Sequence, residues 1–360
     1  MRKITEIIKR IRPIDPRILK ETQRRLDSLT KPKGSLGRLE ELAKTVVAIT
    51  GKENPTLDRK VIFTTVGDHG VARQGVSAFP QEVTLQMVYN FLQGGAAINV
   101  LARGVGVKVL VIDMGVSHEI KCSNGLINKK VAFGTQDMTK GSAMSRKQAF
   151  QSIGGGIEIL EEEVATSGVD IAGTGDMGIA NTTSSSAIVA CITGCGVQDV
   201  TGRGTGIDDE RLKRKIEVIE KALKINQPDP HDPLDILSKV GGFEIGGLVG
   251  CILAAAAHRV PIVIDGFISA ASALIACELC PFLKDYLIAA HRSQEKGHQI
   301  ALNHLGKIPL LDLNMRLGEG TGAVLGMKLV ELGVKILNEM ATFEEARVSR
   351  EEKTKTLQGN

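Results

Sequence analysis

The chain has 360 residues, of which 42% are hydrophobic and 24% are charged, an ordinary composition for a globular protein. The net charge of +4 is mild, and the basic residues are spread along the chain. Composition and charge therefore argue against a nucleic-acid-binding or membrane-binding protein. Aromatic residues make up only 3% of the chain, so the core must be aliphatic.

The N-terminal region, residues 1–50, is expected to be helical. Asp15-Pro16 resembles an N-cap followed by a proline in the first helical turn. Lys31-Pro32-Lys33-Gly34 is a break, after which a second helix is expected from about Ser35-Leu36. Residues 1–10 alternate charged and apolar side chains and so do not form a signal peptide. With six cysteines that show no disulfide framework, this predicts a cytoplasmic, reduced protein.

Four short β-branched runs follow, each ending at a turn that carries Gly or Asp. They are residues 61–66, 107–112, 169–172 and 261–264. Longer helical stretches separate them, so the predicted fold is α/β, a Rossmann-like and mostly parallel sheet with helices on both faces. Ligands of such sheets bind beyond the carboxyl ends of the strands. The longest apolar run, residues 246–257, is too short to span a bilayer.

The tail from Thr321 to Ala346 is predicted as one long helix that returns to the N-terminal helices. The expected organisation is a small helical domain from residues 1–55 with 325–346, a catalytic α/β domain over 56–324, and a polar tail over 347–360.

The segment Gly173-Thr174-Gly175-Asp176-Met177-Gly178 matches G-x-G-x-x-G after a strand. Asp199 lies at a distance that suits a ribose-binding acid, so the pattern alone would suggest a dinucleotide-dependent dehydrogenase. Hydroxyl and amide side chains follow the third glycine, however, and they suit a helix N-terminus that grips a phosphate or sugar. Phosphate binding is the favoured interpretation, and a structural turn is the alternative.

A second glycine-rich loop, Gly202-Arg203-Gly204-Thr205-Gly206, precedes a basic helix that includes Lys215. Glycines let backbone N–H groups approach an anion, and a nearby lysine can neutralise it. A solvated basic helix behind an ordinary loop explains the same pattern equally well.

Glu319 stands among glycines at the start of the last helix. A carboxylate on such a turn can face a ligand with little crowding, or it can simply complement the helix dipole. Gly67-Asp68-His69-Gly70 lacks further ligands at metal spacing and is interpreted as a structural turn. The cysteine pairs Cys191/Cys195 and Cys277/Cys280 are interpreted as buried free thiols, so no metal site is predicted.

Taken together, the motifs resemble one family, and the match covers nearly the whole chain. The matching segments are residues 31–40, 67–71, 75–84, 173–183, 202–209, 241–245, 265–267 and 317–323. Their order and number are similar to those of the nicotinate-nucleotide–dimethylbenzimidazole phosphoribosyltransferase family. The resemblance implies a homodimeric enzyme without a cofactor, which moves the phosphoribosyl group of nicotinate mononucleotide onto a benzimidazole-type base for cobamide synthesis.

The resemblance also implies the roles of particular residues. The catalytic carboxylate falls on Glu319. The phosphate and ribose contacts fall on Gly175, Asp176, Met177, Gly178, Asn181, Thr182, Gly202, Gly204 and Lys215. The base pocket falls on Ser77, Phe79, Gln86, Ser293 and Leu317. Asp176 and Ala180 depart from the family pattern, which has Glu and Gly at these positions, and so the contact made by Asp176 stays open.

The chemistry can be argued separately. The base of nicotinate mononucleotide is a pyridinium, so it leaves as a neutral ring without a general acid. Attack by the acceptor's ring nitrogen makes the other nitrogen's proton acidic, and a carboxylate can accept it. A nicotinamide-dependent dehydrogenase and a non-catalytic nucleotide-binding module are the alternatives. The native acceptor base is not fixed by the sequence.

Overall fold

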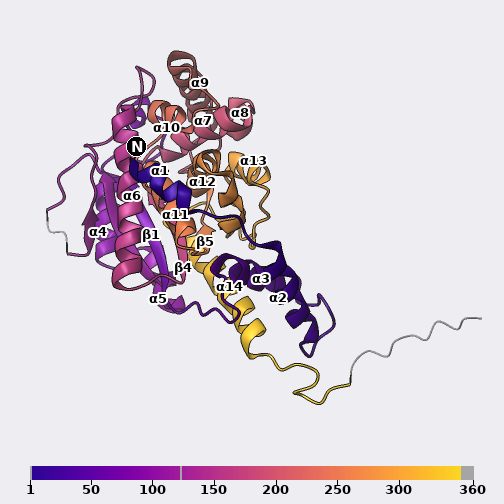
Figure 1. Ribbon diagram of the computed structural model, residues 1–360. Coiled ribbons are helices and arrows are strands. Elements are labelled where there is room, and N and C mark those ends of the chain that lie inside the picture. The colour runs from indigo at the N-terminus through magenta and orange to yellow at the C-terminus, as the bar shows by residue number, and fades with distance from the viewer. Residues whose placement is uncertain (1, 122–123, 350–360) are drawn as a thin grey trace, which may run out of the picture. The chain divides into compact units, whose positions relative to one another are not determined.

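Six parallel strands form one sheet in the computed structural model, which describes residues 2–121 and 124–349 (Figure 1). The strand order is β3-β2-β1-β4-β5-β6. The strands are β1 (Lys60–Gly67), β2 (Lys108–Gly115), β3 (Leu126–Asn128), β4 (Ile171–Met177), β5 (Ile262–Ile264) and β6 (Leu287–Ala289). The predicted fold class is thereby confirmed.

The central strand β1 is buried along its whole length, which is why its sequence is a continuous β-branched run rather than an alternating one. It pairs with β2 on one side and β4 on the other. Along the chain, β2 and β3 are added on one side of β1, and β4, β5 and β6 are then added on the other side. The reversal between β1 and β4 is a topological switch point, the place where such sheets bind ligands.

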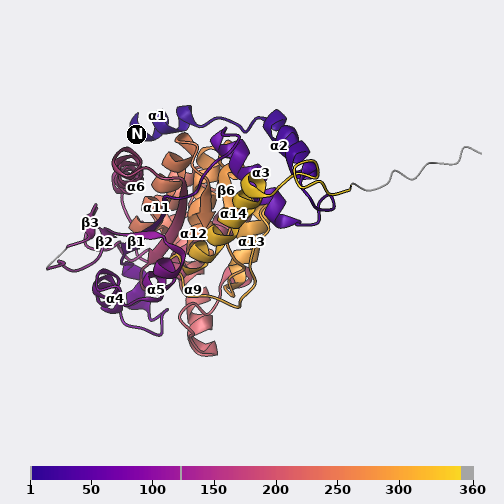
Figure 2. The same ribbon diagram turned by 90° about the horizontal axis from the view of Figure 1, so that it is seen from below.

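Helices cover both faces of this sheet. α11 (Phe243–Ala257) packs against β1, β2, β4 and β5, while α4 (Val83–Leu92) packs against β1 and β2. In Figure 2, α6 (Arg146–Thr166) lies on one side of the first three strands, and α4 and α5 (Ala97–Val105) lie on the other. The remaining helices after the sheet begins are α7 (Asn181–Thr193), α8 (Val197–Val200), α9 (Asp209–Asn226), α10 (Pro233–Val240), α12 (Phe267–Leu279), α13 (Lys296–Leu305) and α14 (Thr321–Glu339), with short 3-10 turns at Gly70–Gln74 and Pro281–Tyr286.

Glycines let α6 and α11 approach backbone to backbone. A Cβ at Gly156 would lie 1.9 Å from the carbonyl oxygen of Gly247, and one at Gly250 would lie 2.1 Å from that of Ile153. Side chains at these positions would separate the two helices, so part of the chain's high glycine content serves packing of the outer layer.

The described part of the chain divides into two compact units: the residues up to 14 with those from 57 to 328, and residues 15–56 with those from 329 onward. The second unit contains α2 (Pro16–Ser28), α3 (Arg38–Thr50) and the later part of α14. Asp15 caps α2 by accepting a hydrogen bond from the backbone N–H of Arg17, as the Asp-Pro pair predicted. The core of this unit is aliphatic and consists of Leu26, Leu29, Ala43, Val47 and Leu337.

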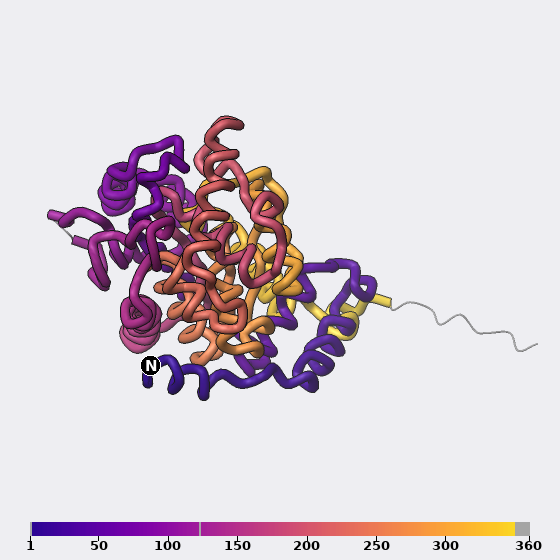
Figure 3. Tube along the Cα trace, turned by 90° about the horizontal axis from the view of Figure 1, so that it is seen from above, coloured from indigo at the N-terminus to yellow at the C-terminus, as the bar shows by residue number. Residues whose placement is uncertain are grey.

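The first helix, α1 (Arg2–Arg10), was predicted to belong to the small domain, but it groups with the large unit. Its buried Ile4 and Ile7 lie on the face that packs against α6 and α11. Figure 3 shows this N-terminal segment beside α6. Its charged residues alternate with apolar ones because one face of a short helix is buried and the other meets water.

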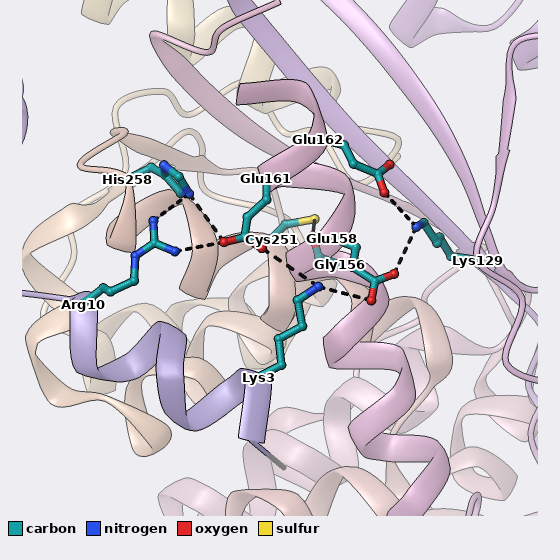
Figure 4. Close-up of polar contacts among 9 residues, drawn as sticks. All are labelled: Lys3, Arg10, Lys129, Gly156, Glu158, Glu161, Glu162, Cys251 and His258. Carbon is teal, nitrogen blue, oxygen red and sulfur yellow. Dashed lines mark hydrogen bonds and ion pairs between the residues drawn. The ribbon is translucent and has the colours of Figure 1, made fainter. Parts of the chain in front are cut away.

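Ion pairs reinforce this placement of α1 (Figure 4). Lys3 Nζ lies 3.2 Å from Glu158 Oε1, and Arg10 Nη1 donates to Glu161 Oε1 at 2.9 Å. Arg10 Nη2 also lies 2.9 Å from Nε2 of His258, at the end of α11. Because these pairs are partly exposed, each contributes little by itself, and the buried isoleucines account for most of the attachment.

Other boundaries also differ from the prediction. β4 starts at Ile171 and continues to Met177, through residues expected to form a turn. β3 and β6 were not predicted, and the final helix ends at Glu339 rather than Ala346. The predicted polar tail extends into residues 350–360, which lie outside the described part of the chain.

Candidate active site

A cavity of about 390 Å³ is built from the segments that follow the strands of the sheet. Residues after β4, β5 and β6 line it, together with the segment before α4 and the turn before α14. The predicted residues that it brings together are Ser77, Phe79, Asp176, Met177, Gly178, Asn181, Thr182, Gly204, Ser293, Leu317 and Glu319. The cavity belongs entirely to the large unit.

Four predicted residues do not line the cavity. Gly175, Gly202 and Lys215 lie directly behind residues that do. Gln86 is exposed on α4, whereas Val83 and Met87 of the same helix line the cavity. Val83 and Met87 are one helical turn apart and share a face of α4. The assignment of Gln86 to the base pocket therefore stays a prediction.

The glycine motif is placed differently from a dinucleotide-binding loop. Gly173 and Gly175 lie inside β4, where they pair with Ile62 and Thr64 of β1. Only Gly178 lies beyond the strand, and a Cβ there would be 2.2 Å from the carbonyl oxygen of Gly67. The glycines of this motif therefore serve close packing, and the interpretation as a dehydrogenase fingerprint loses its structural context.

The turn from β4 into α7 places Asp176 and Asn181 together. The Asn181 side-chain amide donates to Asp176 Oδ2 at 2.9 Å, while Oδ1 is buried and has no hydrogen-bond partner among the described residues. Burial raises the pKa of Asp176 well above its usual range, and the charges of Asp265 and Glu244 add to this. An unpartnered buried carboxyl oxygen in the cavity wall is suited to a ligand hydroxyl group.

Glu319 occupies a constrained turn at the cavity wall. Its φ of 65° is left-handed, which is uncommon for a residue with a side chain. Its backbone N–H donates to the Asp176 carbonyl at 3.1 Å, and its carbonyl accepts from the Thr64 hydroxyl at 3.0 Å. A Cβ at Gly175 would lie 2.4 Å from that carbonyl oxygen. The close packing of β4 against the turn thus fixes where the carboxylate points.

Glu319 is 4% exposed, and its Oε2 accepts from the backbone N–H of Ile98, in the first turn of α5, at 3.2 Å. Burial raises the pKa of Glu319, the Ile98 N–H opposes the rise, and the charge of Asp265 adds to it. A carboxylate with a raised pKa is a stronger base than an ordinary one. The carboxylate thus also meets the N-terminus of α5, besides lying just before α14, where the sequence alternative placed its dipole contact.

Asp265, directly after β5, holds the same turn from the other side. Its Oδ2 accepts from the Gly320 N–H at 3.2 Å, and its Oδ1 accepts from the Ala323 N–H at 2.9 Å. The sequence showed Asp265 only as a turn residue after a strand, and its distance from Glu319 along the chain hid the contact. His291, whose Nε2 lies 3.9 Å from Asp265 Oδ1, lines the cavity and was not singled out.

Lys215 is completely buried, which separates it from the solvated basic residues of α9. Its Nζ donates to the Thr182 hydroxyl at 2.8 Å and to the Gly202 carbonyl at 3.2 Å. Burial lowers the pKa of Lys215 to about 8. The ammonium group therefore joins the second glycine-rich loop to the first turn of α7, where an anion would meet both.

Comparison with known proteins identifies the family. A family model described as phosphoribosyltransferase matches residues 11–348. A nicotinate-nucleotide–dimethylbenzimidazole phosphoribosyltransferase from Geobacter metallireducens is 56% identical, over 96% of this chain and 98% of that protein. One from a Roseiflexus species is 58% identical, over 96% and 98%. The crystal structure of such an enzyme from Thermus thermophilus matches with a TM-score of 0.89 at 42% identity, over 94% of this chain and all of that one.

The chain belongs to the nicotinate-nucleotide–dimethylbenzimidazole phosphoribosyltransferase family. The resemblance seen in the sequence motifs is thereby confirmed.

In this family member, one side of the cavity is largely apolar. The sequence motifs pointed to Phe79 and Leu317, and both are more than half exposed at the cavity. The structure adds apolar lining residues that had been given no site role: Val76, Val83, Met87, Ile179, Phe267 and Ile268. Four of them lie inside the matching segments, whereas Met87 and Ile268 lie just beyond the ends of such segments.

Other polar clusters of this phosphoribosyltransferase lie outside the cavity lining. His69 is fully buried between Glu244 Oε1, at 2.5 Å, and the Ser184 hydroxyl, at 2.9 Å. Such pairing suits the structural turn predicted for this segment. Cys277 and Cys280 are free and buried, whereas Cys191 and Cys195 are free and half-buried. Burial raises the pKa of the Cys277 thiol to about 12, which leaves it unreactive.

Proposed function

We propose that this protein transfers the phosphoribosyl group of nicotinate mononucleotide to 5,6-dimethylbenzimidazole or a related base. Nicotinate leaves, and α-ribazole phosphate, the lower-ligand precursor of a cobamide, is formed. The observation that carries the proposal is the buried Glu319 carboxylate, held on a packed turn at the wall of a cavity with an apolar side. A planar aromatic base fits an apolar pocket whose edge carries one strong acceptor.

The reaction needs little besides orientation and one base. The pyridinium of the donor is already a good leaving group, because cleavage of its bond to C1′ returns an electron pair to the ring nitrogen. The acceptor's unprotonated nitrogen forms the new bond to C1′ from the opposite face. Glu319 then accepts the proton of the other ring nitrogen, so charge does not build up on the product. Holding both rings at C1′ supplies a large part of the rate enhancement.

The donor's phosphate is assigned to the region between α7 and the second glycine-rich loop. Lys215 supplies the charge, and the first turn of α7 supplies backbone N–H groups. Asp176 and Asn181 face the ribose in this arrangement. The acceptor base is assigned to the apolar side, next to Leu317 and Ser77.

The homodimer and the cytoplasmic location also belong to the proposal. None of the helices within residues 2–121 and 124–349 is long and apolar enough to cross a bilayer. A two-fold dimer is expected because most soluble oligomers are cyclic dimers and because the resemblance implies one. An active monomer at micromolar concentration in sedimentation would contradict it.

The test is direct. The protein is incubated with nicotinate mononucleotide and a panel of bases (dimethylbenzimidazole, benzimidazole, a phenol and adenine), and both free nicotinate and the new nucleotide are followed. Base-dependent release of nicotinate is expected. Hydride exchange with NAD would favour the dehydrogenase alternative, and donor binding without release would favour a non-catalytic module.

A further inference from the structure

Three charged side chains hold the loop Gly202–Gly204. Glu295 Oε1 accepts from the Gly204 N–H at 2.8 Å, and Lys215 Nζ donates to the Gly202 carbonyl at 3.2 Å. From the cavity rim, Arg316 Nη1 donates to the Gly204 carbonyl at 3.2 Å. A glycine-rich loop is expected to be mobile, yet both ends of this one are tied to side chains from other elements.

Glu295 is buried and held in place beside the Gly202–Gly204 loop. It is 6% exposed, it lines the cavity, and it lies just before α13, on the segment that follows β6. Its backbone N–H donates to the Ser293 hydroxyl at 3.3 Å. A Cβ at Gly202 would lie 2.4 Å from Glu295 Oε2, so the loop has glycine where the carboxylate meets it. The Oε2 atom has no hydrogen-bond partner among the described residues.

Lys215 forms no ion pair within 4.0 Å among the described residues, although it is completely buried. The groups that face it are the Thr182 hydroxyl from α7, the Gly202 carbonyl and the nearby charge of Glu295, while Arg316 holds the same loop at the Gly204 carbonyl. Burial lowers the pKa of Lys215 to about 8, and the charge of Glu295 opposes this lowering. The other acid that holds this loop, Asp209, pairs with the Arg203 side chain.

We propose that Glu295 is a positioning residue for the donor's phosphate. It fixes the Gly202–Gly204 loop through the Gly204 N–H and supplies the negative charge that faces the Lys215 ammonium group. The proposal rests on the proposed function, because it assigns the phosphate of nicotinate mononucleotide to this loop. Through Glu295, the segment after β6 also contributes to the phosphate side of the cavity.

Two substitutions separate the hydrogen bond from the charge. Glu295→Gln keeps an oxygen that accepts the Gly204 N–H but removes the charge. Only protonated Lys215 attracts phosphate, so the wild-type kcat/KM for the donor should fall as pH rises through about 8. In the Gln variant this fall should begin at lower pH, while the KM for dimethylbenzimidazole stays unchanged. Glu295→Asp keeps the charge but is one methylene shorter, so it should retain the wild-type pH profile with a raised donor KM.

Glu295→Ala removes both contributions, and its donor KM should rise on the order of tenfold or more across the whole pH range. Glu217→Gln is the matched control, since Glu217 is an exposed acid on α9 two residues after Lys215. It should leave the pH profile where it is.

The outcomes are distinct. An unchanged alkaline limb in the Gln variant, or equal changes in the KM values of donor and base, would overturn the proposal. Thermal midpoints measured in parallel show whether each variant is folded, and the pH shift is a property that loss of packing alone would not produce. Failure of the proposed function would show in another way, as a wild-type protein that releases no nicotinate.

Discussion

Replacing Glu319 by Gln tests the central assignment with the smallest possible change. The two side chains have nearly the same shape, and the Gln carbonyl can still accept the Ile98 N–H that Glu319 Oε2 accepts now at 3.2 Å. The turn itself is held by backbone contacts to Asp176 and Thr64, which the substitution does not touch. The variant should therefore fold normally, without the base.

The expected magnitude follows from the role. General-base catalysis typically contributes ~10²–10⁴-fold, so kcat should fall by about that factor, which corresponds to roughly 2.7–5.4 kcal/mol of activation free energy. The free energy of unfolding should not fall with the activity. Burial raises the pKa of Glu319, so its ionised form is less favourable in the folded than in the unfolded protein. Ionisation above that pKa lowers the free energy of unfolding, and a neutral Gln should leave the thermal midpoint unchanged or higher.

The assay is nicotinate release at saturating donor and base, with the thermal midpoint measured on the same samples. Wild-type kcat should rise with pH through a pKa above the usual glutamate range, because the ionised carboxylate is the active form. The Gln variant should lose this acid limb. If Glu319 only complements a helix dipole, the variant would lose at most ~1 kcal/mol of stability and keep its turnover. Turnover within a few-fold of wild type would remove Glu319 from the catalytic role.

Three further changes probe other parts of the molecule. Lys215→Ala should raise the KM for nicotinate mononucleotide on the order of tenfold or more, because a charge-assisted contact contributes roughly 1.5–3 kcal/mol; an equal rise for the base would contradict the assignment. Gly175→Ala should lower kcat by displacing the turn that carries the catalytic carboxylate, whereas Gly104→Ala, where a Cβ meets nothing within 4 Å, should have no effect on turnover. In the small unit, Lys31 Nζ and Glu40 Oε1 form a buried pair at 2.8 Å. Lys31→Met should destabilise that unit by about 3–5 kcal/mol, seen as faster amide exchange in α2 and α3, and adding Glu40→Gln should recover much of the loss.

The sequence was informative where one local rule decides the structure. β1 and β2 were predicted because buried parallel strands require continuous β-branched runs, and the start of α2 because Asp15-Pro16 is a strong capping signal. β3 and β6 have three residues each, too few for any periodicity to be visible. The end of β4 was misplaced because glycine normally marks a turn, whereas Gly173 and Gly175 are strand residues under close packing.

Among the residues of the candidate site, those in linear motifs could be predicted and those brought in by the fold could not. Glu319 and Lys215 stand in linear motifs, and the resemblance gave both a role. Asp265 and Glu295 contact those motifs only through the fold, across separations along the chain that no local pattern records. Burial was equally hidden, because nothing in the basic run of α9 shows that Lys215 alone among its neighbours faces inward.

One half of the cavity is lined mainly by backbone and the other mainly by side chains. This difference should determine which substitutions the protein tolerates. The side that we assign to the donor includes much main chain: the turn after β4, the first turn of α7 and the loop Gly202–Gly204. A Cβ at Gly178 would collide with a backbone carbonyl, and one at Gly202 with a buried carboxylate. The side that we assign to the acceptor is a set of aliphatic and aromatic side chains, several of them partly exposed. Side chains can be exchanged one at a time, whereas a backbone surface cannot. Laboratory evolution of this protein should therefore yield new acceptor bases far more readily than new sugar phosphates.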